Sequence, residues 1–360
     1  MNEDMTRQTV TVVMTVKNDP AGCALTLESL ISQTRAPQEI VVVDGGSHDN
    51  TPEVVRAFSD RLSQLRFIEA PGANIAEGRN IGSKAATGTI IATTDAGCRA
   101  APEWLEKLIA PFEADPRTEF VAGFYQIEPQ SLLEQVVGLA TMRGQLDPVD
   151  PATFNPSGRS MAYTKTLWER AGGWPAWLGF SEDTLFDHKL RRMNVRWAFA
   201  GDAVVHWRPR TTLRKVARQF YNYGTGRGHT NIGARDFAYN LRNLAILGLA
   251  TALCFVAPIV LAECAPQSFS PSGGEGRVRG TMLALLVATA LFLYFYIWTF
   301  HAKAVRIARR SRNWRAYPLT ILVMWIVLAS NLLGYVIGCS QRFRHRHRYQ
   351  RALDAYMGAT

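Results

Sequence analysis

The chain has 360 residues, with 40 Lys and Arg against 30 Asp and Glu, for a net charge of +10. Eleven of the basic residues, and no acidic ones, lie in two short segments, 301–315 and 341–351, that adjoin long apolar stretches. Basic segments in such places contact lipid headgroups and fix membrane topology, so we expect membrane lipids and no nucleic acid as partners. The five cysteines are scattered, as expected for a reducing cytosol and a membrane interior.

The N-terminal elements have the pattern of an α/β sheet. Thr9–Val16 predicts a first strand, which closes near Asn18, and Ile40–Val43 predicts a second strand that ends at Asp44. Ligands of open α/β sheets bind at the carboxyl ends of such strands. A carboxylate there can accept hydrogen bonds from a base or a ribose, and Gly46 lets the backbone approach a ligand closely. The alternative is a strand-to-helix turn capped by Asp and Ser.

A third apolar strand, Thr89–Thr94, ends at Asp95, about fifty positions after Asp44. Between them, residues 74–82 open a helix that carries Arg79. Two strands that end in acidic residues and are joined by helical crossovers predict a nucleotide-and-metal site. Arg79 is either a planar donor to a diphosphate or a solvated arginine at the start of a helix.

The order of these motifs resembles family 2 glycosyltransferases, which have the nucleotide-diphosphosugar transferase (GT-A) fold. The resemblance covers roughly residues 8–230 and is closest to exopolysaccharide enzymes of the succinoglycan type. It implies an α/β domain with a mostly parallel sheet. It also implies nucleotide-binding roles for a set of residues at the strand ends and the following helix: Val16, Asn18, Asp44, Gly46, Arg79 and Asp95.

The same resemblance assigns the catalytic residues. The Ser181-Glu182-Asp183 segment matches the acidic motif that supplies the base, with Asp183 as the base and Glu182 beside it. A single carboxylate that deprotonates an acceptor hydroxyl, with in-line attack, inverts the anomeric configuration. The alternative is that these residues only cap the helix that follows.

The resemblance implies a divalent metal, Mg²⁺ or Mn²⁺, held by Asp95 and His206. Gly97 stands where the family has its second metal-binding Asp, so one carboxylate is missing. Three outcomes are open: Asp95 holds the metal with His206, diphosphate oxygens and water; the metal binds weakly and depends on the substrate; or arginines replace its charge. A packed, hydrogen-bonded histidine is the alternative for His206.

Three residues are candidates for acceptor binding. Arg159 lies in a Pro/Ser/Gly segment, and Trp174 lies in an aromatic stretch that resembles the family's acceptor wall, although tryptophan is more often core. Gln219 stands where processive members carry Q-x-x-R-W, but the arginine and tryptophan of that motif are missing. This departure argues against a synthase that extrudes a long polymer.

The last third of the chain predicts a membrane domain. Residues 244–261, 281–300 and 316–341 are uncharged and mostly apolar for 18, 20 and 26 residues, long enough to cross a bilayer. We therefore predict a cytoplasmic catalytic domain over 1–236 and a membrane domain over 237–341, with spans at about 242–262, 280–300 and 317–340. Residues 342–360 form a basic tail. Three crossings put this tail outside, against the positive-inside rule, unless one segment is re-entrant or interfacial.

Together these features predict a multi-pass enzyme of the inner (plasma) membrane. It would transfer a sugar from a nucleotide-diphosphate sugar, with a uridine diphosphate sugar as the expected donor, to a lipid-linked saccharide at the cytoplasmic face. Exopolysaccharide or cell-surface glycan synthesis is the expected context. The alternatives are a polyprenyl-phosphate sugar synthase, whose acceptor is the lipid phosphate itself, and a non-catalytic membrane scaffold that keeps a degenerate nucleotide-sugar fold.

Overall fold

The computed structural model describes residues 8–235, 237–238, 241–242, 244–245, 286–287, 289–290, 293–294 and 300–358. The first two predicted spans lie almost entirely outside the described residues. The strands are β1 (Val10–Val16), β2 (Glu39–Asp44), β3 (Leu65–Glu69), β4 (Ile90–Asp95), β5 (Cys98–Ala100), β6 (Phe120–Ile127), β7 (Met161–Thr164) and β8 (Trp197–Trp207). The helices of the sheet domain are α1 (Pro20–Ile31), α2 (Thr51–Ala57), α3 (Ile75–Ala85), α4 (Trp104–Ala114), α6 (Lys165–Arg170) and α7 (Glu182–Arg192), with a short 3₁₀ turn at Pro151–Thr153. Five further helices stand against one side of this domain: α5 (Leu132–Thr141), α8 (Leu213–Thr230), α11 (Ala302–Arg310), α12 (Ala316–Arg344) and α13 (Arg346–Gly358).

The eight strands form one sheet in the order β3-β2-β1-β4-β7-β6-β8-β5. Strands β1 to β4 are parallel to one another, as are β6 and β8, whereas β7 is antiparallel to β4 and β6, and β5 is antiparallel to β8. The register pairs Val16 with Asp44 and Thr15 with Asp95, so the carboxyl ends of β1, β2 and β4 meet at one edge. The predicted α/β class with a mostly parallel sheet is confirmed.

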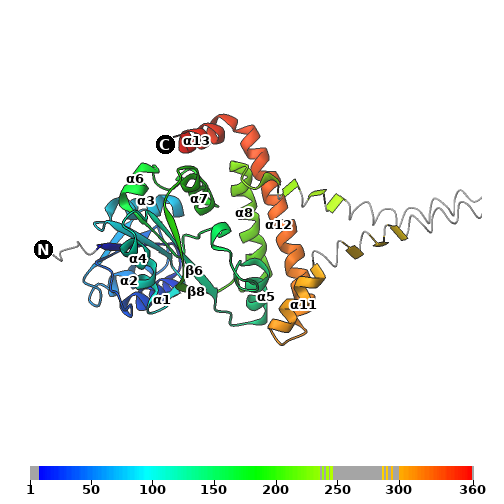
Figure 1. Ribbon diagram of the computed structural model, residues 1–360, viewed down its shortest axis with the longest axis horizontal. Helices are drawn as coiled ribbons and strands as arrows, with labels where there is room; N and C mark the ends of the chain where they lie inside the picture. Colours follow the sequence, from blue (N-terminus) through cyan, green and yellow to red (C-terminus); the bar gives the residue numbers. More distant parts are fainter. Residues whose placement is uncertain are drawn as a thin grey trace, which may run out of the picture.

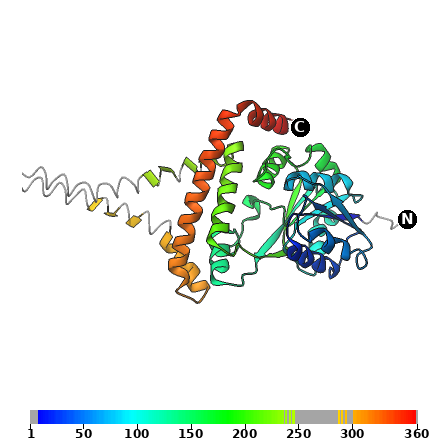
Figure 2. The same cartoon turned by 180° about the vertical axis from the view of Figure 1, so that it is seen from behind.

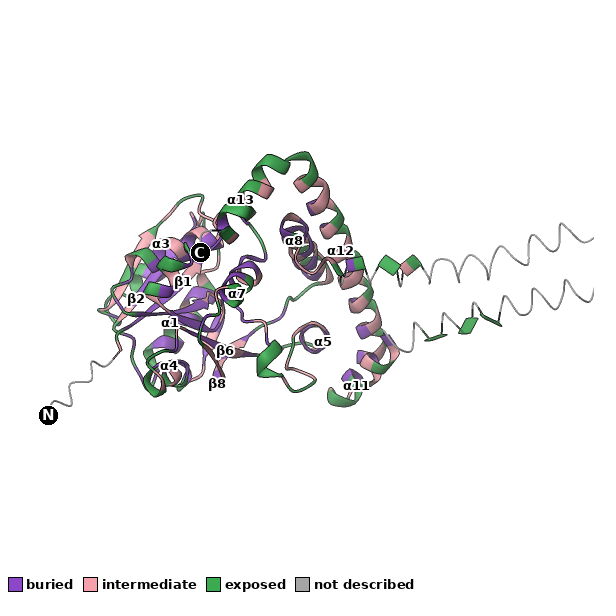
Figure 3. Cartoon of the chain, turned by 45° about the horizontal axis from the view of Figure 1, so that its top comes forward, coloured by how far each residue is buried: buried purple, intermediate pink, exposed green. Residues whose placement is uncertain are grey.

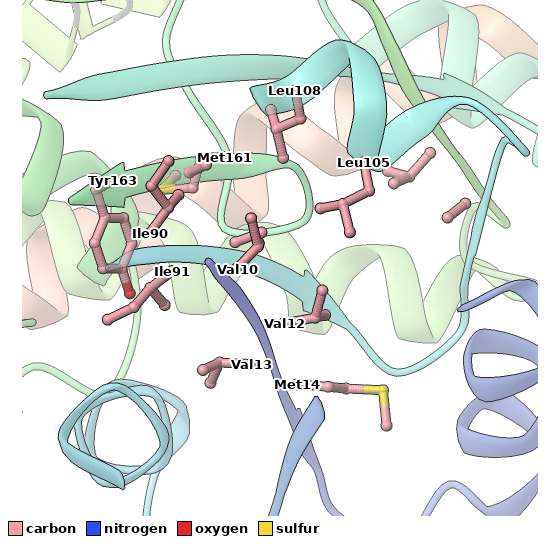
Figure 4. Close-up of a cluster of buried hydrophobic side chains, with 14 of the residues drawn as sticks. Val10, Val12, Val13, Met14, Ile90, Ile91, Leu105, Leu108, Met161 and Tyr163 are labelled. Atoms are coloured by element: carbon pink, nitrogen blue, oxygen red, sulfur yellow. The ribbon is translucent and has the colours of Figure 1, made fainter. Parts of the chain in front are cut away.

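The central strands are buried on both faces because helices cover both. Figure 4 shows side chains of β1 and β4 with Leu105 and Leu108 of α4 on one side of them. On the other side α3 lies unusually close to β1: a Cβ at Gly82 would come within 2.4 Å of Val13. This glycine contact holds α3, and with it Arg79, against the sheet edge where Asp95 ends β4.

Helices α5, α8, α11 and α12 share a second hydrophobic cluster, separate from the core of the sheet. Its buried members come from all four helices: Val136, Val137, Leu139, Ala140, Val216, Phe220, Ile307, Ala308, Ala316 and Val323. Helix α8 lies between the sheet domain and α12 in both views (Figures 1 and 2). Among the residues described, α12 is the one helix long and apolar enough to cross a membrane.

Glycines allow α12 to lie directly on α8. A Cβ at Gly334 would lie 2.0 Å from the carbonyl oxygen of Tyr221, and one at Gly338 would lie 2.3 Å from that of Thr225. A step of four residues along α12, from Gly334 to Gly338, matches a step of four in the same direction along α8, from Tyr221 to Thr225. The two helices therefore run parallel. Close backbone approach through small residues of this kind is a feature of tightly packed helix pairs.

We expect Gly334→Ala to loosen this helix pair. The added methyl group overlaps backbone, which cannot rotate away, and overpacking of this kind costs about 1–3 kcal/mol. Gly358→Ala is the matched control, because nothing lies within 4 Å of the position its Cβ would occupy. Thermal unfolding of both variants measures the difference. A Gly334→Ala variant as stable as the control would contradict the packing.

Candidate active site

The loops after β1 and β2 form one hydrogen-bonded cluster. Both Asp44 carboxylate oxygens accept the Ser47 N–H at 3.1 Å, and Oδ1 also accepts the Ser47 hydroxyl at 2.6 Å. Asn18 donates its N–H to Ser47 Oγ and accepts the His48 N–H, both at 2.8 Å. Asn18 itself has φ of 51°, a left-handed conformation that asparagine tolerates better than most residues. The structure therefore brings Val16, Asn18 and Asp44 to one place, joined by Ser47, whose role the sequence did not reveal.

Arg79 is the centre of the site, but it is buried. Its side chain is 2% exposed, with Nη2 2.7 Å from Asp95 Oδ1 and Nη1 2.7 Å from Glu182 Oε1. The guanidinium lies 4.7 Å from the ring centroid of Trp174. Gly158 closes over it, since a Cβ there would come within 2.2 Å of Nη2. This placement contradicts a direct contact between Arg79 and a diphosphate: the arginine holds two carboxylates in position instead.

The two acidic residues at the start of α7 have different environments. Glu182 is buried and faces Arg79, so it has no access to a substrate, contrary to its predicted catalytic role. Asp183 is half-buried and lines a cavity. Its Oδ1 accepts the Thr184 N–H at 2.8 Å, so it also contacts the first turn of its own helix. The position of Asp183 is therefore compatible with both of its predicted roles, as a base and as a capping residue.

In the immediate surroundings of Arg79, carboxylates outnumber guanidinium groups. Burial raises the pKa of Glu182, and the neighbouring Asp183 raises it further, whereas Arg79 lowers it; the result is a pKa of about 7. Burial lowers the pKa of Arg79, but Asp95, Glu182 and Asp183 outweigh it and raise that pKa above its usual value. One guanidinium thus faces three carboxylates, which favours a proton on one of them or an added cation.

This arrangement predicts a pH effect on stability. An acid whose pKa is raised on folding binds more protons in the folded state than in the unfolded state. Its contribution to the stability of the folded protein is therefore complete below the pKa of the unfolded state, and this contribution is lost as the pH rises through the pKa of the folded state. From the ordinary value of 4.5 to about 7, Glu182 should therefore make the protein progressively less stable.

Each unit of the shift corresponds to about 1.4 kcal/mol. Glu182→Gln should remove this slope, so the gap between its thermal midpoint and that of the wild type should change over this pH range. Parallel curves for the two proteins would show that Glu182 stays ionised throughout.

The cavity beside Asp183 has a volume of about 550 Å³ and lies between the sheet domain and α8. Arg159 lines it, with its guanidinium 4.6 Å from the ring centroid of Trp207 and 5.9 Å from that of Tyr125. Its Nη1 donates to Ser157 Oγ at 3.0 Å, and it forms no ion pair with any carboxylate in the described part of the chain. Four arginines line the cavity: Arg143, Arg159, Arg191 and Arg227. Such a lining suits an anionic ligand.

The other two predicted acceptor residues do not line this cavity. Trp174 is 1% exposed, stacks on Phe186 at 4.4 Å and donates its indole N–H to Tyr163. This burial contradicts stacking on a sugar, and Trp174 is a core residue that supports Arg79. Gln219 is also buried and donates to the Tyr223 hydroxyl at 2.8 Å. Because Tyr223 lines the cavity, Gln219 reaches it only through that tyrosine.

Asn80, the neighbour of Arg79 on α3, has a role that the sequence did not reveal. Its Oδ1 accepts the Trp174 N–H at 2.7 Å and its Nδ2 donates to the Trp174 carbonyl at 2.9 Å. Arg79 and Asn80 therefore hold Trp174 from two sides, through its ring and its backbone. The sequence shows only that Arg79 and Asn80 are adjacent at the start of α3. It does not show their common partner, Trp174, which lies 94 residues after Asn80.

The predicted metal site, with Asp95 and His206 as ligands, stays a prediction. No three His, Cys, Asp or Glu side chains converge to hold a metal among the residues described. His206 pairs with Arg99 across the ladder of β8 and β5; burial and Arg99 lower the pKa of His206, while Glu128 raises it. Gly97 has φ of +86°, which explains a glycine in place of the second Asp. The donor set fits Mg²⁺ or Mn²⁺ only if Asp95 is joined by phosphate oxygens and water.

Comparison with known proteins agrees with the fold and motifs. Residues 11–164 match the model of glycosyl transferase family 2. A validoxylamine A glucosyltransferase of Streptomyces hygroscopicus subsp. limoneus is 34% identical over 126 residues, which are 34% of this chain and 28% of that protein. The uncharacterized glycosyltransferase EpsJ of Bacillus subtilis (strain 168) is 27% identical over 44% of this chain and 47% of its own length.

A solved structure, the mannosyltransferase PcManGT of Pyrobaculum calidifontis in complex with GDP-Man and Mn²⁺, is 20% identical, covers 99% of this chain and 86% of its own, and has a TM-score of 0.48. The family model thus matches residues 11–164, less than half of the chain, and over that segment the chain is similar to glycosyl transferase family 2. The matched segments span less than half the length of these two sequence relatives.

Proposed function

We propose that the chain is an inverting glycosyltransferase of the plasma membrane. It transfers a sugar from a nucleotide-diphosphate sugar, a uridine diphosphate sugar in our proposal, to a lipid-linked saccharide at the cytoplasmic face, in exopolysaccharide or cell-surface glycan synthesis. The observation that carries the proposal is the position of Asp183: it lines the arginine-rich cavity, while its neighbour Glu182 is tied through Arg79 to Asp95 at the nucleotide edge of the sheet.

In this mechanism Asp183 takes the proton of the acceptor hydroxyl as that oxygen attacks the anomeric carbon. The bond to the nucleoside diphosphate breaks on the opposite side, so the configuration inverts. Asn18 and the Asp44–Ser47 loop bind the nucleoside. A bound Mg²⁺ or Mn²⁺ would neutralise charge on the departing diphosphate, with Asp95 as its protein ligand. Arg79 holds Asp95 and Glu182 in fixed positions. This bridge fixes the position of α7, which carries Asp183, relative to the carboxyl end of β4, where the donor binds.

The cavity supports an acceptor that carries phosphate. Arg143, Arg159 and Arg227 line the cavity, and planar guanidinium groups bind phosphate and diphosphate groups well. The same lining favours the second candidate, a polyprenyl-phosphate sugar synthase, because the lipid phosphate would then be the nucleophile and would need no base. The two candidates share the donor and differ in the atom that attacks.

The test is a transfer assay with the purified full-length protein, a panel of nucleotide sugars, and Mg²⁺ or Mn²⁺. Sugar transfer to a polyprenyl-diphosphate-linked saccharide, with inversion, supports the proposal. Transfer to polyprenyl phosphate alone supports the second candidate. The absence of nucleotide binding and of donor hydrolysis with every sugar tested would favour the non-catalytic scaffold.

A further inference from the structure

We propose that α12 does not cross the membrane but lies along its surface, in the leaflet on the side of the catalytic domain, with its apolar stripe inserted among anionic lipids. The stripe consists of exposed residues spaced three, four or seven apart, as on one face of a helix: Pro318, Leu322, Trp325, Ala329, Leu333, Val336 and Phe343. This proposal concerns how the enzyme sits on its membrane and does not depend on which sugar it transfers.

Both ends of α12 are fixed to the catalytic domain. At its start, Ala316 and Val323 pack with Val136 and Val137 of α5. After its end, α13 returns to the sheet domain, where the Tyr356 hydroxyl donates to the Gly173 carbonyl at 2.9 Å. Lys189 of α7 donates to the Tyr356 carbonyl and lies 4.3 Å from that ring. A helix of 29 residues is about 43 Å long, so a crossing would carry its ends to opposite sides of the bilayer.

The partner of α12 also argues against a crossing. Helix α8 runs parallel to α12 and touches it through Gly224 and Gly228. Its exposed residues include Arg214, Lys215 and Arg218, and no acidic residue accompanies them in the helix. If α12 crossed the bilayer, α8 would enter it too, and three cations that form no ion pair with any described residue would be very costly in hydrocarbon.

The two faces of α12 are nevertheless sharply different. One packs on α8, as described, and the opposite face is apolar and open: Leu333 is 57% exposed, Val336 49% and Phe343 83%. Figure 3 shows buried α8 residues beside an α12 whose outer residues are intermediate or exposed. Exposed apolar residues that form a continuous stripe mark an interaction surface rather than solvated protein.

The charge around the stripe identifies a lipid surface as the occupant. No Asp or Glu occurs between residues 301 and 353, whereas six Lys and Arg precede α12, two Arg lie in its last turn and three Arg follow it within residues 345–351. A helix with one apolar face and basic ends binds in the plane of an anionic bilayer. In this orientation the basic tail stays on the catalytic-domain side, which agrees with the positive-inside rule that a third crossing violates.

Topology is tested on the full-length protein in cells, with a reporter fused after Thr360. We expect a fluorescent-protein fusion to be bright and an alkaline-phosphatase fusion to remain at background, because the tail stays in the cytosol. An active phosphatase fusion would overturn the proposal.

Depth is tested with the purified full-length protein in bilayers of phosphatidylglycerol and phosphatidylcholine. The bilayers carry bromines either near the headgroup or at the acyl methyl end. Trp325 lies near the middle of α12, and its signal is the difference between the wild type and Trp325→Phe. We expect at least twofold stronger quenching by the shallow bromines, and at least a twofold loss of that quenching without phosphatidylglycerol.

Stronger quenching by the deep bromines would show a crossing. No quenching at either depth would show that protein, not lipid, covers the stripe. Quenching that does not change when phosphatidylglycerol is removed would reject the anionic surface.

Discussion

Asp183→Asn should lower the rate of sugar transfer by about 10² to 10⁴, the range that a positioned base contributes, while the affinity for the nucleotide sugar stays close to that of the wild type. The reason is geometric. Asp183 lines the cavity and is absent from the hydrogen-bonded cluster of Asn18, Asp44 and Ser47, which we propose to bind the nucleoside. Asparagine keeps the shape of the side chain and its contact with the Thr184 N–H, but it cannot take a proton.

The measurements are steady-state transfer to a lipid-linked acceptor, donor binding by calorimetry, and the thermal midpoint. Asp202→Asn is the matched control, because Asp202 is an exposed carboxylate on β8 and its loss should change none of the three. Unchanged transfer by Asp183→Asn would reject the base. A variant that loses about 1 kcal/mol of stability and keeps its transfer rate would assign Asp183 to helix capping alone.

The sequence patterns predicted which residues lie at the carboxyl edge of the sheet. They did not predict which side chains from other segments pack over that edge. The β-branched runs that end at Asp44 and Asp95 predicted two parallel strands with carboxylates at one edge, and the register places them there. This worked because strand burial and strand ends are local properties of the chain. The coarse fold was therefore accessible from the sequence alone.

The roles of Arg79 and Trp174 depend on contacts between distant segments. Arg79 meets Glu182 across 103 residues, and Trp174 stacks on Phe186 beneath it. A periodic pattern records which residues prefer burial, but not which buried residues meet. Arg79, at the start of a helix, was therefore expected to be either a diphosphate ligand or a solvated arginine, whereas the folded chain encloses it.

For the last apolar segment, 317–340, the sequence predicted a long apolar helix but not the protein contacts of that helix. A long uncharged run satisfies the criteria for a membrane span whatever covers it, and α12 matches that run. The signal that it packs on protein was the pair Gly334 and Gly338, spaced four residues apart. Its meaning depends on the matching glycines of α8, more than a hundred residues earlier.

Arg79→Ala should be the most damaging single substitution in the sheet domain. Removal of one partner from a buried ion pair leaves uncompensated charge and costs about 3–5 kcal/mol, and here Asp95 and Glu182 both lose their partner. Arg61→Ala is the matched control. Arg61 pairs with Glu28 at the surface, where both side chains are about half exposed, and such pairs contribute about 1 kcal/mol or less.

Denaturant unfolding of the purified full-length variants, followed by tryptophan fluorescence, gives both differences. A double variant separates charge from packing. If the damage comes from unpaired carboxylates, Arg79→Met combined with Glu182→Gln should be less destabilised than the sum of the two single variants, since the pair is removed together.

Additive effects would instead attribute the loss to the packing of the guanidinium on Trp174. Equal stability of Arg79→Ala and Arg61→Ala would contradict the burial of Arg79. The bridge from Asp95 through Arg79 to Glu182 connects β4 directly to α7, which carries Asp183. Without a buried Arg79, a different contact would have to fix α7 relative to β4.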